Sequence, residues 1–201
     1  MCGRYLIACD EGIAEIEKIL MDISDNYSGT DITACTGEIF PSGNAPILSL
    51  QNGRPSISLM TWGFPKWDGK GVIINARSET AAEKKMFRES LLHRRCVILS
   101  TGFYEWGKLS GRAKEKYRFN DPSGPMLYMA GTYNMFPDSR FVVLTCDANE
   151  YVRDIHDRMP VMLYKDELIR WLTDYEFAIG VMKRDNAVLE RTVALGKGNE
   201  I

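Results

Sequence analysis

The sequence predicts a single α+β domain, residues 1–201, built on a mainly antiparallel, curved β-sheet. Hydrophobic residues make up 45% and charged residues 26% of the chain, which is ordinary for a globular protein. About seven to ten short segments have the pattern of strands, and three have the pattern of helices. The two kinds of segment do not alternate regularly, which argues against a doubly wound parallel sheet.

The first third of the chain begins with a strand over residues 3–9 (GRYLIAC), where side chains alternate between two faces. Asp10 can cap a helix with an apolar stripe. The stripe consists of Ile13, Ile16, Ile19 and Leu20. Residues 24–55 read as loop-rich, with short extended pieces around residues 39–40 and 47–48.

The middle and end of the chain supply the remaining elements. Residues 56–62 alternate as a strand, with Ile57, Leu59 and Thr61 on one face, and Gly63 and Pro65 stop it. Thr80 and Glu83 have the spacing of a capping box, which predicts a helix reaching about Arg94. A last helix over 165–175 should bury Leu168, Trp171 and Leu172. Further strands are expected over 72–75, 96–99, 116–119, 126–135, 141–145 and 188–194.

Charge and composition exclude several classes of function. The formal net charge is −2, so any nucleic-acid binding must use a local basic patch. No apolar stretch could span a membrane, and the N-terminus does not resemble a signal peptide, so we expect a cytoplasmic protein. The five cysteines form no C-x-x-C pair and are expected to be free thiols; with only two histidines, neither a metal site nor another cofactor is predicted.

Cys2 is the first candidate for chemistry. Removal of Met1 would leave a cysteine with a free α-amine, and this 1,2-aminothiol condenses with an aldehyde to a thiazolidine. No internal cysteine can do so, because its nitrogen is an amide. The alternative is that Cys2 is an incidental small residue at the start of a strand.

Glu105 and His156 are candidate proton carriers. Glu105 lies in the segment GFYEWG, where three aromatic neighbours should desolvate its carboxyl and raise its pKa. His156 lies in IHDRMP and can move a proton near neutral pH. Alternatively, Glu105 faces water on an edge strand, and His156 belongs to a salt-bridged turn. His93 ends a helix beside two arginines and is interpreted as structural.

Polar and aromatic residues could bind an anionic polymer. Asn75 ends a buried strand and Arg77 follows it, and an arginine fork suits phosphate. Trp62, Trp67 and Trp106 could stack on bases. Trp62 and Trp67 flank a Gly-Pro turn, so we expect them to be only partly buried, although aromatic residues often belong to the core. The basic run over 108–118 is either a phosphate track or a solvated loop.

Five motifs together resemble the SRAP (SOS response-associated peptidase) family, the abasic-site-crosslinking proteins of bacteria and eukaryotes. They occur in the family's order between residue 2 and about residue 172. The motifs are MCGRY at 1–5, WGFPKW at 62–67, NARSET at 75–80, GFYEW at 102–106 and IHDRMP at 155–160.

The resemblance implies a compact, barrel-like α+β fold and a covalent activity on single-stranded DNA. Met1 would be removed by the protein itself, and Cys2 would form a thiazolidine with the aldehyde of an abasic site. Glu105 would be the acid and base, Asn75 would hold the terminal amine region, and His156 would assist proton transfer at the sugar. The implied DNA contacts are phosphate contacts by Arg4, Arg77 and Arg158 and base contacts by Trp62, Trp67 and Trp106.

The chain departs from the family at residues 38–43, EIFPSG, where relatives often carry a stretch like NIAPTQ. The acid and the bulky phenylalanine could alter DNA contacts near this loop. The proline usual before the GFYEW motif is replaced by Leu99. Neither difference touches the proposed reacting groups.

Three hypotheses follow from the sequence. The first is a monomeric DNA-damage protein that captures abasic sites covalently, with reversal and weak lyase activity. The second is a cysteine peptidase acting in trans, with Cys2 as nucleophile and His156 as base. The third is a non-catalytic module that binds abasic and intact single strands equally.

Overall fold

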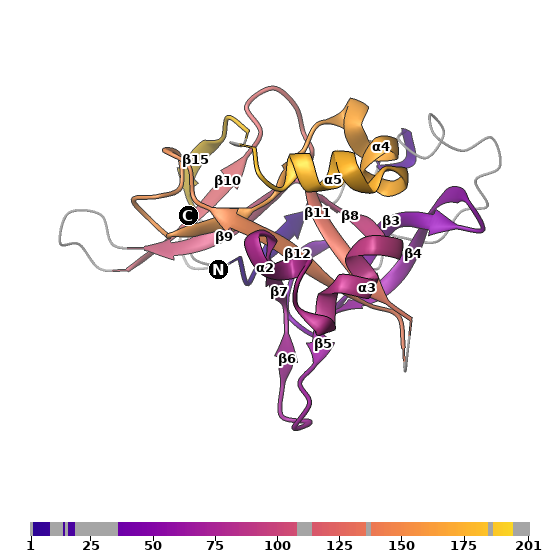
Figure 1. Ribbon diagram of the computed structural model, residues 1–201. Helices are drawn as coiled ribbons and strands as arrows, with labels where there is room; N and C mark the ends of the chain where they lie inside the picture. The colour runs from indigo at the N-terminus through magenta and orange to yellow at the C-terminus, as the bar shows by residue number, and fades with distance from the viewer. Residues whose placement is uncertain are drawn as a thin grey trace.

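The computed structural model describes most of the chain (Figure 1). The described residues are 2–8, 14, 16–18, 36–107, 114–135, 138–184 and 187–194. They form a mixed α+β fold that consists mostly of strands in largely antiparallel sheets, as the sequence predicts.

Five strands of the larger sheet close into a ring, in the order β12–β4–β3–β8–β11 and back to β12. These strands are β3 (Asn44–Gln51), β4 (Arg54–Trp62), β8 (Arg95–Ser100), β11 (Leu127–Asn134) and β12 (Arg140–Asp147). Four of the five pairings are antiparallel, and β12 closes the ring by running parallel to β4. Closure removes the open edges of these strands, which confirms the barrel-like core.

The remaining strands extend the ring or stand beside it. β7 (Asn75–Arg77) and β13 (Arg158–Pro160) both pair with β12, and β14 (Met162–Leu163) pairs with β11. β5 (Phe64–Pro65) and β6 (Val72–Ile73) form a hairpin that projects from the body of the molecule (Figure 1).

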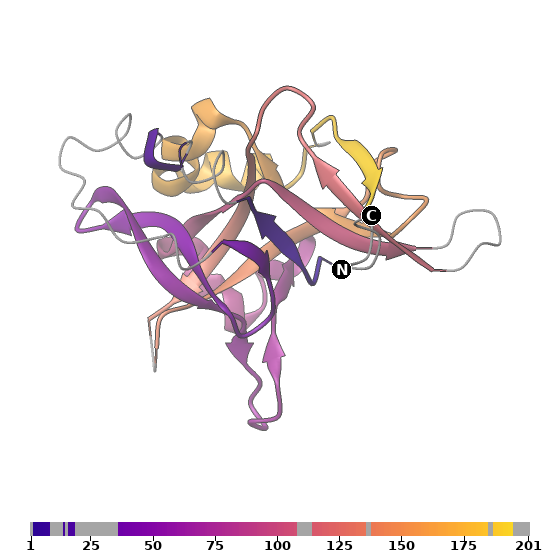
Figure 2. The ribbon, with the colours of Figure 1, turned by 180° about the vertical axis from the view of Figure 1, so that it is seen from behind.

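A second sheet holds the N-terminal strand between two others, in the order β15–β10–β9–β1–β2. Its strands are β1 (Tyr5–Ile7), β2 (Gly37–Ile39), β9 (Gly102–Gly107), β10 (Glu115–Asn120) and β15 (Glu190–Val193). Only Thr101 separates β9 from β8, so one continuous stretch of chain joins the two sheets. The sheet therefore holds the N-terminal residues against the barrel (Figure 2).

Both predicted long helices are divided in the structure. The helix expected over 80–94 consists of α2 (Ser78–Ala81) and α3 (Lys85–His93), so the capping-box prediction was wrong. The helix expected over 165–175 consists of the 3₁₀ turn η2 (Lys165–Glu167) and α4 (Leu168–Thr173). Asp174 ends it, because its side chain accepts a hydrogen bond from Phe177 N at 2.9 Å and caps α5 (Tyr175–Val181).

Residues 44–51 form a long strand rather than loop, and the GFYEWG segment is itself a strand. In β4, Leu59 is exposed, whereas Met60 and Trp62 are buried. The helix predicted after Asp10 lies largely outside the described residues, although residues 16–18 are helical and Ile16 is buried.

Candidate active site

The register of the second sheet places the N-terminus beside Glu105. In β1, Tyr5 pairs with Phe103 and Leu6 with Gly102, antiparallel. One step further, Tyr104 N donates a hydrogen bond to Arg4 O at 2.9 Å. The same register brings residues 2 and 3 alongside residues 105 and 106, so two motifs a hundred residues apart in sequence meet (Figure 2).

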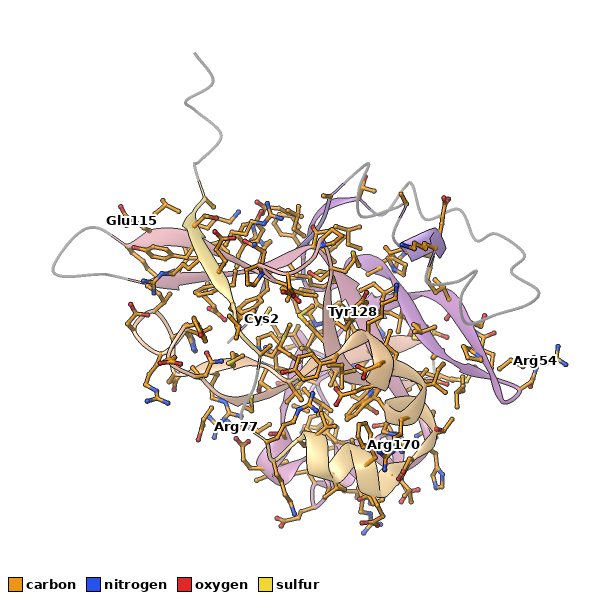
Figure 3. All side chains as sticks on the ribbon, turned by 90° about the horizontal axis from the view of Figure 1, so that it is seen from above. Cys2, Arg54, Arg77, Glu115, Tyr128 and Arg170 are labelled. Atoms are coloured by element: carbon orange, nitrogen blue, oxygen red, sulfur yellow. The ribbon has the colours of Figure 1, made fainter. Side chains whose placement is uncertain are left out.

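Cys2 is fully buried in the structure (Figure 3). Its Sγ lies 3.7 Å from Arg4 O, which accepts a weak hydrogen bond from the thiol. Burial, and after it the negative charge of Glu105, raises the pKa of the Cys2 thiol far above its usual range. The thiol is therefore protonated at neutral pH, and the effect of Glu105 reflects how close the two side chains are.

Glu105 is 3% exposed on β9. Burial raises the pKa of its carboxyl from 4.5 to about 7, with a further rise caused by Asp157 and an opposing effect of Lys114. This burial confirms the predicted desolvation of the carboxyl. The alternative, a glutamate that faces water, was wrong. A group with this pKa can both accept and return a proton near neutral pH.

Asn75 reaches Cys2 from the barrel. It opens β7, which lies parallel to β12 with Asn75 opposite Val143. Its Nδ2 donates a hydrogen bond to Cys2 O at 3.0 Å. Its Oδ1 is buried and has no hydrogen-bond partner among the described residues. Asn75 thus holds the backbone carbonyl of Cys2 through Nδ2, and its Oδ1 is left available to accept a further hydrogen bond.

His156 approaches from the loop between β12 and β13. Gly107, at the end of β9, packs against this loop, since a Cβ at position 107 would lie 2.8 Å from Ile155 Cγ2 and 2.9 Å from Ile155 O. Arg158 N donates to His156 Nδ1 at 3.0 Å, and Asp157 Oδ1 lies 2.8 Å from the same nitrogen. Burial lowers the pKa of His156, which favours the neutral imidazole. Asp157 and Lys114 influence the pKa of both His156 and Glu105, so the two groups share one electrostatic environment.

The three tryptophans predicted to contact bases have different surroundings. Trp62 is fully buried, its Nε1 donates to Ile74 O at 3.0 Å, and its ring packs against Tyr5 and Phe141. The expectation that Trp62 is partly buried was therefore wrong, and its ring presents no face to a ligand. Trp67, between β5 and β6, is 97% exposed. Trp106 is half-buried beside Arg4.

The three arginines predicted to contact phosphates also differ. Arg77 is exposed at the end of β7 (Figure 3). Arg4 is partly exposed and pairs with Glu38 at 2.9 Å. Arg158 is buried, and its guanidinium donates to both carboxylate oxygens of Glu79 at 2.7 and 2.8 Å, to Thr145 O at 2.7 Å and to Asp147. The guanidinium of Arg158 is thus paired with groups of the protein itself, next to the His156 loop.

Two neighbouring pockets lead away from Asn75. One, of about 480 Å³, is lined in part by Asn75, Arg77, Lys84 and Lys85, and the other, of about 640 Å³, by Lys85, Trp67 and Arg140. They share Lys85 and Met86 and form what we call the basic groove, which runs from Asn75 to the exposed Trp67. Lys84 and Lys85 were not among the predicted phosphate contacts, although two adjacent lysines shortly after Arg77 were an available signal.

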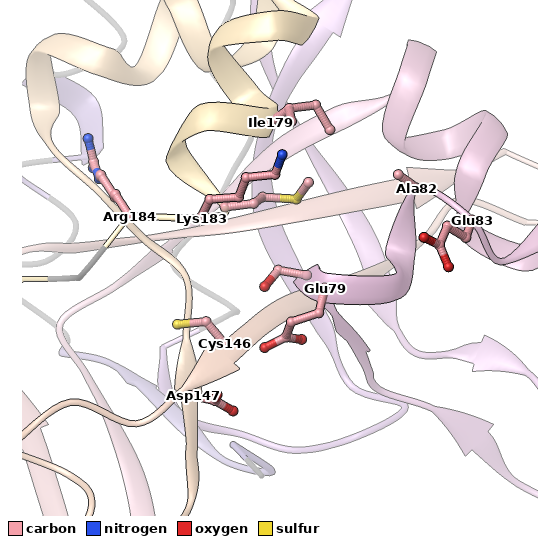
Figure 4. A pocket seen from close by; sticks show the side chains of 10 residues that line it. Glu79, Ala82, Glu83, Cys146, Asp147, Ile179, Lys183 and Arg184 are labelled. Atoms are coloured by element: carbon pink, nitrogen blue, oxygen red, sulfur yellow. The ribbon is translucent and has the colours of Figure 1, made fainter.

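A third pocket, of about 570 Å³, lies elsewhere (Figure 4). It is lined by Glu79 and Asp147, the partners of Arg158, and by Lys183, Arg184 and the thiol of Cys146. Arg184 in turn pairs with Glu167 through both carboxylate oxygens. None of Cys2, Asn75, Glu105 and His156 lines this pocket, and most of its charges already have partners, so it is separate from the candidate active site.

The described part of the chain holds no cluster of three or more side chains suited to a metal ion. Within the same residues, no helix has the length and apolar character needed to cross a membrane. Among the described residues, Cys2, Cys96 and Cys146 form no disulfide bond.

The sequence matches a known family and several of its members. The family model for the SOS response associated peptidase (SRAP) matches residues 1–185. The abasic site processing protein YoaM of Bacillus subtilis is 34% identical over 189 residues, covering 86% of this chain and 79% of YoaM. A second B. subtilis protein of that description, YobE, is 37% identical over 189 residues, covering 86% and 82% of the two chains.

Solved structures show the same fold. A crystal structure of a Bordetella bronchiseptica protein superposes with a TM-score of 0.77 at 19% identity, covering 96% of this chain and 100% of that one. A Bacteroides thetaiotaomicron protein gives a TM-score of 0.76 at 23% identity, covering 96% and 91% of the two chains. The match of the family model over most of the sequence, supported by these relatives, shows that the chain belongs to the SRAP family.

Proposed function

We propose that the protein processes abasic sites in single-stranded DNA by capturing them covalently through Cys2, after Met1 has been removed. The supporting observation is the meeting of Cys2, Asn75 and Glu105 at one point of the fold. The names of its relatives, abasic site processing proteins, support the choice of substrate.

The first step is hydrolysis of the Met1–Cys2 peptide bond. One water is consumed, methionine leaves, and the α-amine of Cys2 is freed. Asn75 Nδ2 already holds the carbonyl of Cys2, and the unused Oδ1 of Asn75 is a suitable acceptor for the new amine. Asn75 would therefore keep the amine in place for attack on the substrate.

The second step is condensation with the ring-opened sugar. The amine nitrogen attacks the C1′ aldehyde, and the resulting carbinolamine loses water to give an imine. Sγ then adds to the imine carbon while the thiol proton passes to the nitrogen, which closes the thiazolidine ring. The net change is the loss of one water. At the imine stage, removal of a proton from C2′ would expel the 3′ phosphate, which accounts for weak lyase activity.

Glu105 suits the proton transfers of this sequence. With a pKa of about 7 it can accept a proton from the amine or thiol and donate one to the departing hydroxyl. Neutral His156 would assist at the opened sugar. We assign Arg158 a positioning role for the His156 loop, because its guanidinium already donates hydrogen bonds to Glu79, Asp147 and Thr145 O.

The basic groove offers a path for the DNA strand. Arg77, Lys84 and Lys85 can contact phosphates, and the exposed ring of Trp67 can stack on a base. Trp106 lies in β9 of the second sheet, and Arg4 directly precedes β1 and contacts the Cys2 thiol through its carbonyl oxygen. The strand would thus cross the site from this sheet to the β5–β6 hairpin.

The protonated, buried thiol of Cys2 disfavours the second hypothesis, a peptidase acting in trans. A peptidase nucleophile needs a thiolate, which requires a lowered pKa, whereas the surroundings of Cys2 raise it. Amine attack followed by thiol addition to an imine does not need a preformed thiolate.

A denaturing gel with a single strand carrying one abasic site tests the proposal. The processed protein should give a heat-stable adduct, and Cys2→Ala should give none. Cys2→Ser should form only an imine, which borohydride traps. Cys146→Ala, which removes a half-buried thiol elsewhere, is the matched control and should behave like the wild type.

A wild-type yield of adduct from Cys2→Ala would contradict the proposal. Equal binding of intact and abasic strands with no covalent band would favour a non-catalytic module. Turnover of peptides by the processed protein would favour a trans peptidase.

A further inference from the structure

Glu38 lies on the outer face of the second sheet, among cations and aromatic rings. Strand β2 places Glu38 opposite Leu6, and β10 places Lys116 opposite Trp106 of β9. Arg4 precedes Leu6 by two residues and so shares its face. We call this group the Glu38 cluster; its members are Arg4, Glu38, Phe40, Tyr104, Trp106 and Lys116.

Each oxygen of the Glu38 carboxylate faces a different cation. Oε2 accepts a hydrogen bond from Arg4 Nη1 at 2.9 Å, and Oε1 accepts one from Lys116 Nζ. The three side chains are between 21% and 30% exposed, so solvent reaches the group. Burial alone would raise the pKa of Glu38, but the hydrogen bonds from Lys116 and Arg4 outweigh burial and lower it. The carboxylate is therefore ionised at neutral pH.

Aromatic rings hold both cations independently of Glu38. The Arg4 guanidinium lies 3.7 Å from the centroid of the Phe40 ring, and Lys116 Nζ lies 3.8 Å from that of Tyr104. Trp106 lies between them, 5.4 Å from Arg4 and 5.6 Å from Lys116. Such cation–π contacts keep the two charges in place when the carboxylate moves away. Two fixed cations around one oxyanion form a site that fits a phosphodiester.

The Glu38 cluster adjoins the candidate active site. Arg4 O accepts hydrogen bonds from Tyr104 N and from the thiol of Cys2, and Trp106 directly follows Glu105. A phosphate bound by Arg4 and Lys116 would therefore belong to a nucleotide close to the reacting sugar.

We propose that Glu38 is a specificity-determining residue, whose carboxylate occupies the phosphate subsite of Arg4 and Lys116 and weakens binding to intact single strands. The inference rests on the proposed function. Phosphate contacts contribute most of the sequence-independent affinity for nucleic acid. A protein that gives up one such contact dissociates faster from undamaged DNA, and the covalent step then selects the damaged site. Because partly exposed ion pairs are weak, Glu38 reduces the affinity and does not abolish it.

Equilibrium binding of an intact, fluorescently labelled single strand across a salt series tests the inference. Glu38→Gln keeps the shape of the side chain and removes its charge. It should bind on the order of 10-fold more tightly at low salt, because a phosphate no longer has to replace the two partly exposed ion pairs of Glu38. Its plot of log K against log salt should steepen by about 0.7 for each additional phosphate that the protein neutralises. The double variant Glu38→Gln/Lys116→Gln should lose most of this increase in affinity.

Glu176→Gln is the matched control, because it removes the same charge from an exposed position on α5. An unchanged affinity and salt slope in folded Glu38→Gln would overturn the inference, and so would an equal increase in affinity in Glu176→Gln. Glu38→Ser repeats the test if thermal unfolding shows that the amide destabilises the sheet. Adduct formation with an abasic strand is measured in parallel. Its absence in the wild type would refute the proposed function, whereas adducts without an affinity change would refute only the role of Glu38.

Discussion

Replacing Glu105 with glutamine should change how the stability of the protein depends on pH. In the folded protein burial raises the pKa of this carboxyl from 4.5 to about 7. The folded state therefore holds the proton more tightly than the unfolded chain. The resulting stability is fully present below pH 4.5 and is lost as the pH rises through about 7. The difference between the two pKa values corresponds to about 3 kcal/mol.

Urea unfolding of the wild type and Glu105→Gln between pH 4.5 and 8.5 measures this effect. The free energy of unfolding of the variant, minus that of the wild type, should rise by about 3 kcal/mol across the range, since the amide cannot ionise. Contributions of other groups cancel in the difference. Glu176→Gln, which removes an exposed carboxyl, should show little change. A difference between Glu105→Gln and the wild type that does not vary with pH would refute the reasoning about the buried carboxyl.

Four other substitutions have expected outcomes. Arg158→Lys loses the two-oxygen contact with Glu79 and should lower the free energy of unfolding by about 2–4 kcal/mol, and an unchanged denaturation midpoint would speak against this network. Gly131→Ala places a Cβ 2.3 Å from Ile98 Cδ1 and 2.8 Å from Val142 O, so overpacking in the barrel should cost about 1–3 kcal/mol in thermal or chemical unfolding. Trp67→Ala should change the free energy of unfolding by less than about 0.5 kcal/mol but weaken single-strand binding by about 1–3 kcal/mol, because its ring is exposed. Trp62→Ala should lower the free energy of unfolding by about 3–5 kcal/mol, because its ring is buried. The reverse pattern would contradict the surroundings assigned to the two rings.

Local patterns predicted those parts of the fold that depend on neighbouring residues. The strand at 3–9, the buried strand before Gly102 and the apolar face of the helix around Trp171 all follow from short-range hydrophobic periodicity. The desolvation of Glu105 follows from its aromatic neighbours in sequence. These features need no knowledge of how distant segments pack.

Features that depend on contacts between distant segments could not be predicted from local sequence patterns. Trp62 is buried because β12 closes the barrel beside β4, a pairing of segments about 80 residues apart. Arg158 is engaged internally because Glu79 reaches it from α2. The sequence suggests an edge strand as one alternative for the GFYEWG segment, yet pairing with β1 on one side and β10 on the other makes it a central strand. Sequence motifs therefore predicted side chains that the fold brings close together, but the fold decided which of the expected DNA contacts remain exposed.

Residues 38–43, where the sequence departs from its relatives, also depend on a distant segment. The substitution of an acid and an aromatic residue indicated altered DNA contacts, and the structure shows both Glu38 and Phe40 touching Arg4. Whether Glu38 strengthens or weakens DNA binding depends on Lys116 as well. Only the register of the sheet shows that Lys116 lies next to Glu38.

The central claim is that a free amine and thiol on Cys2 act together on an aldehyde. A fusion with a cleavable leader gives a matched pair of samples: cut, so that Cys2 is the first residue, and uncut. Each is incubated with an abasic single strand, and the products are analysed by intact mass and peptide mapping. The account predicts an adduct only from the cut sample, attached at Cys2 and lighter by one water than the sum of its parts. A stable adduct at the same rate from the uncut sample, or one attached at another residue, would contradict it.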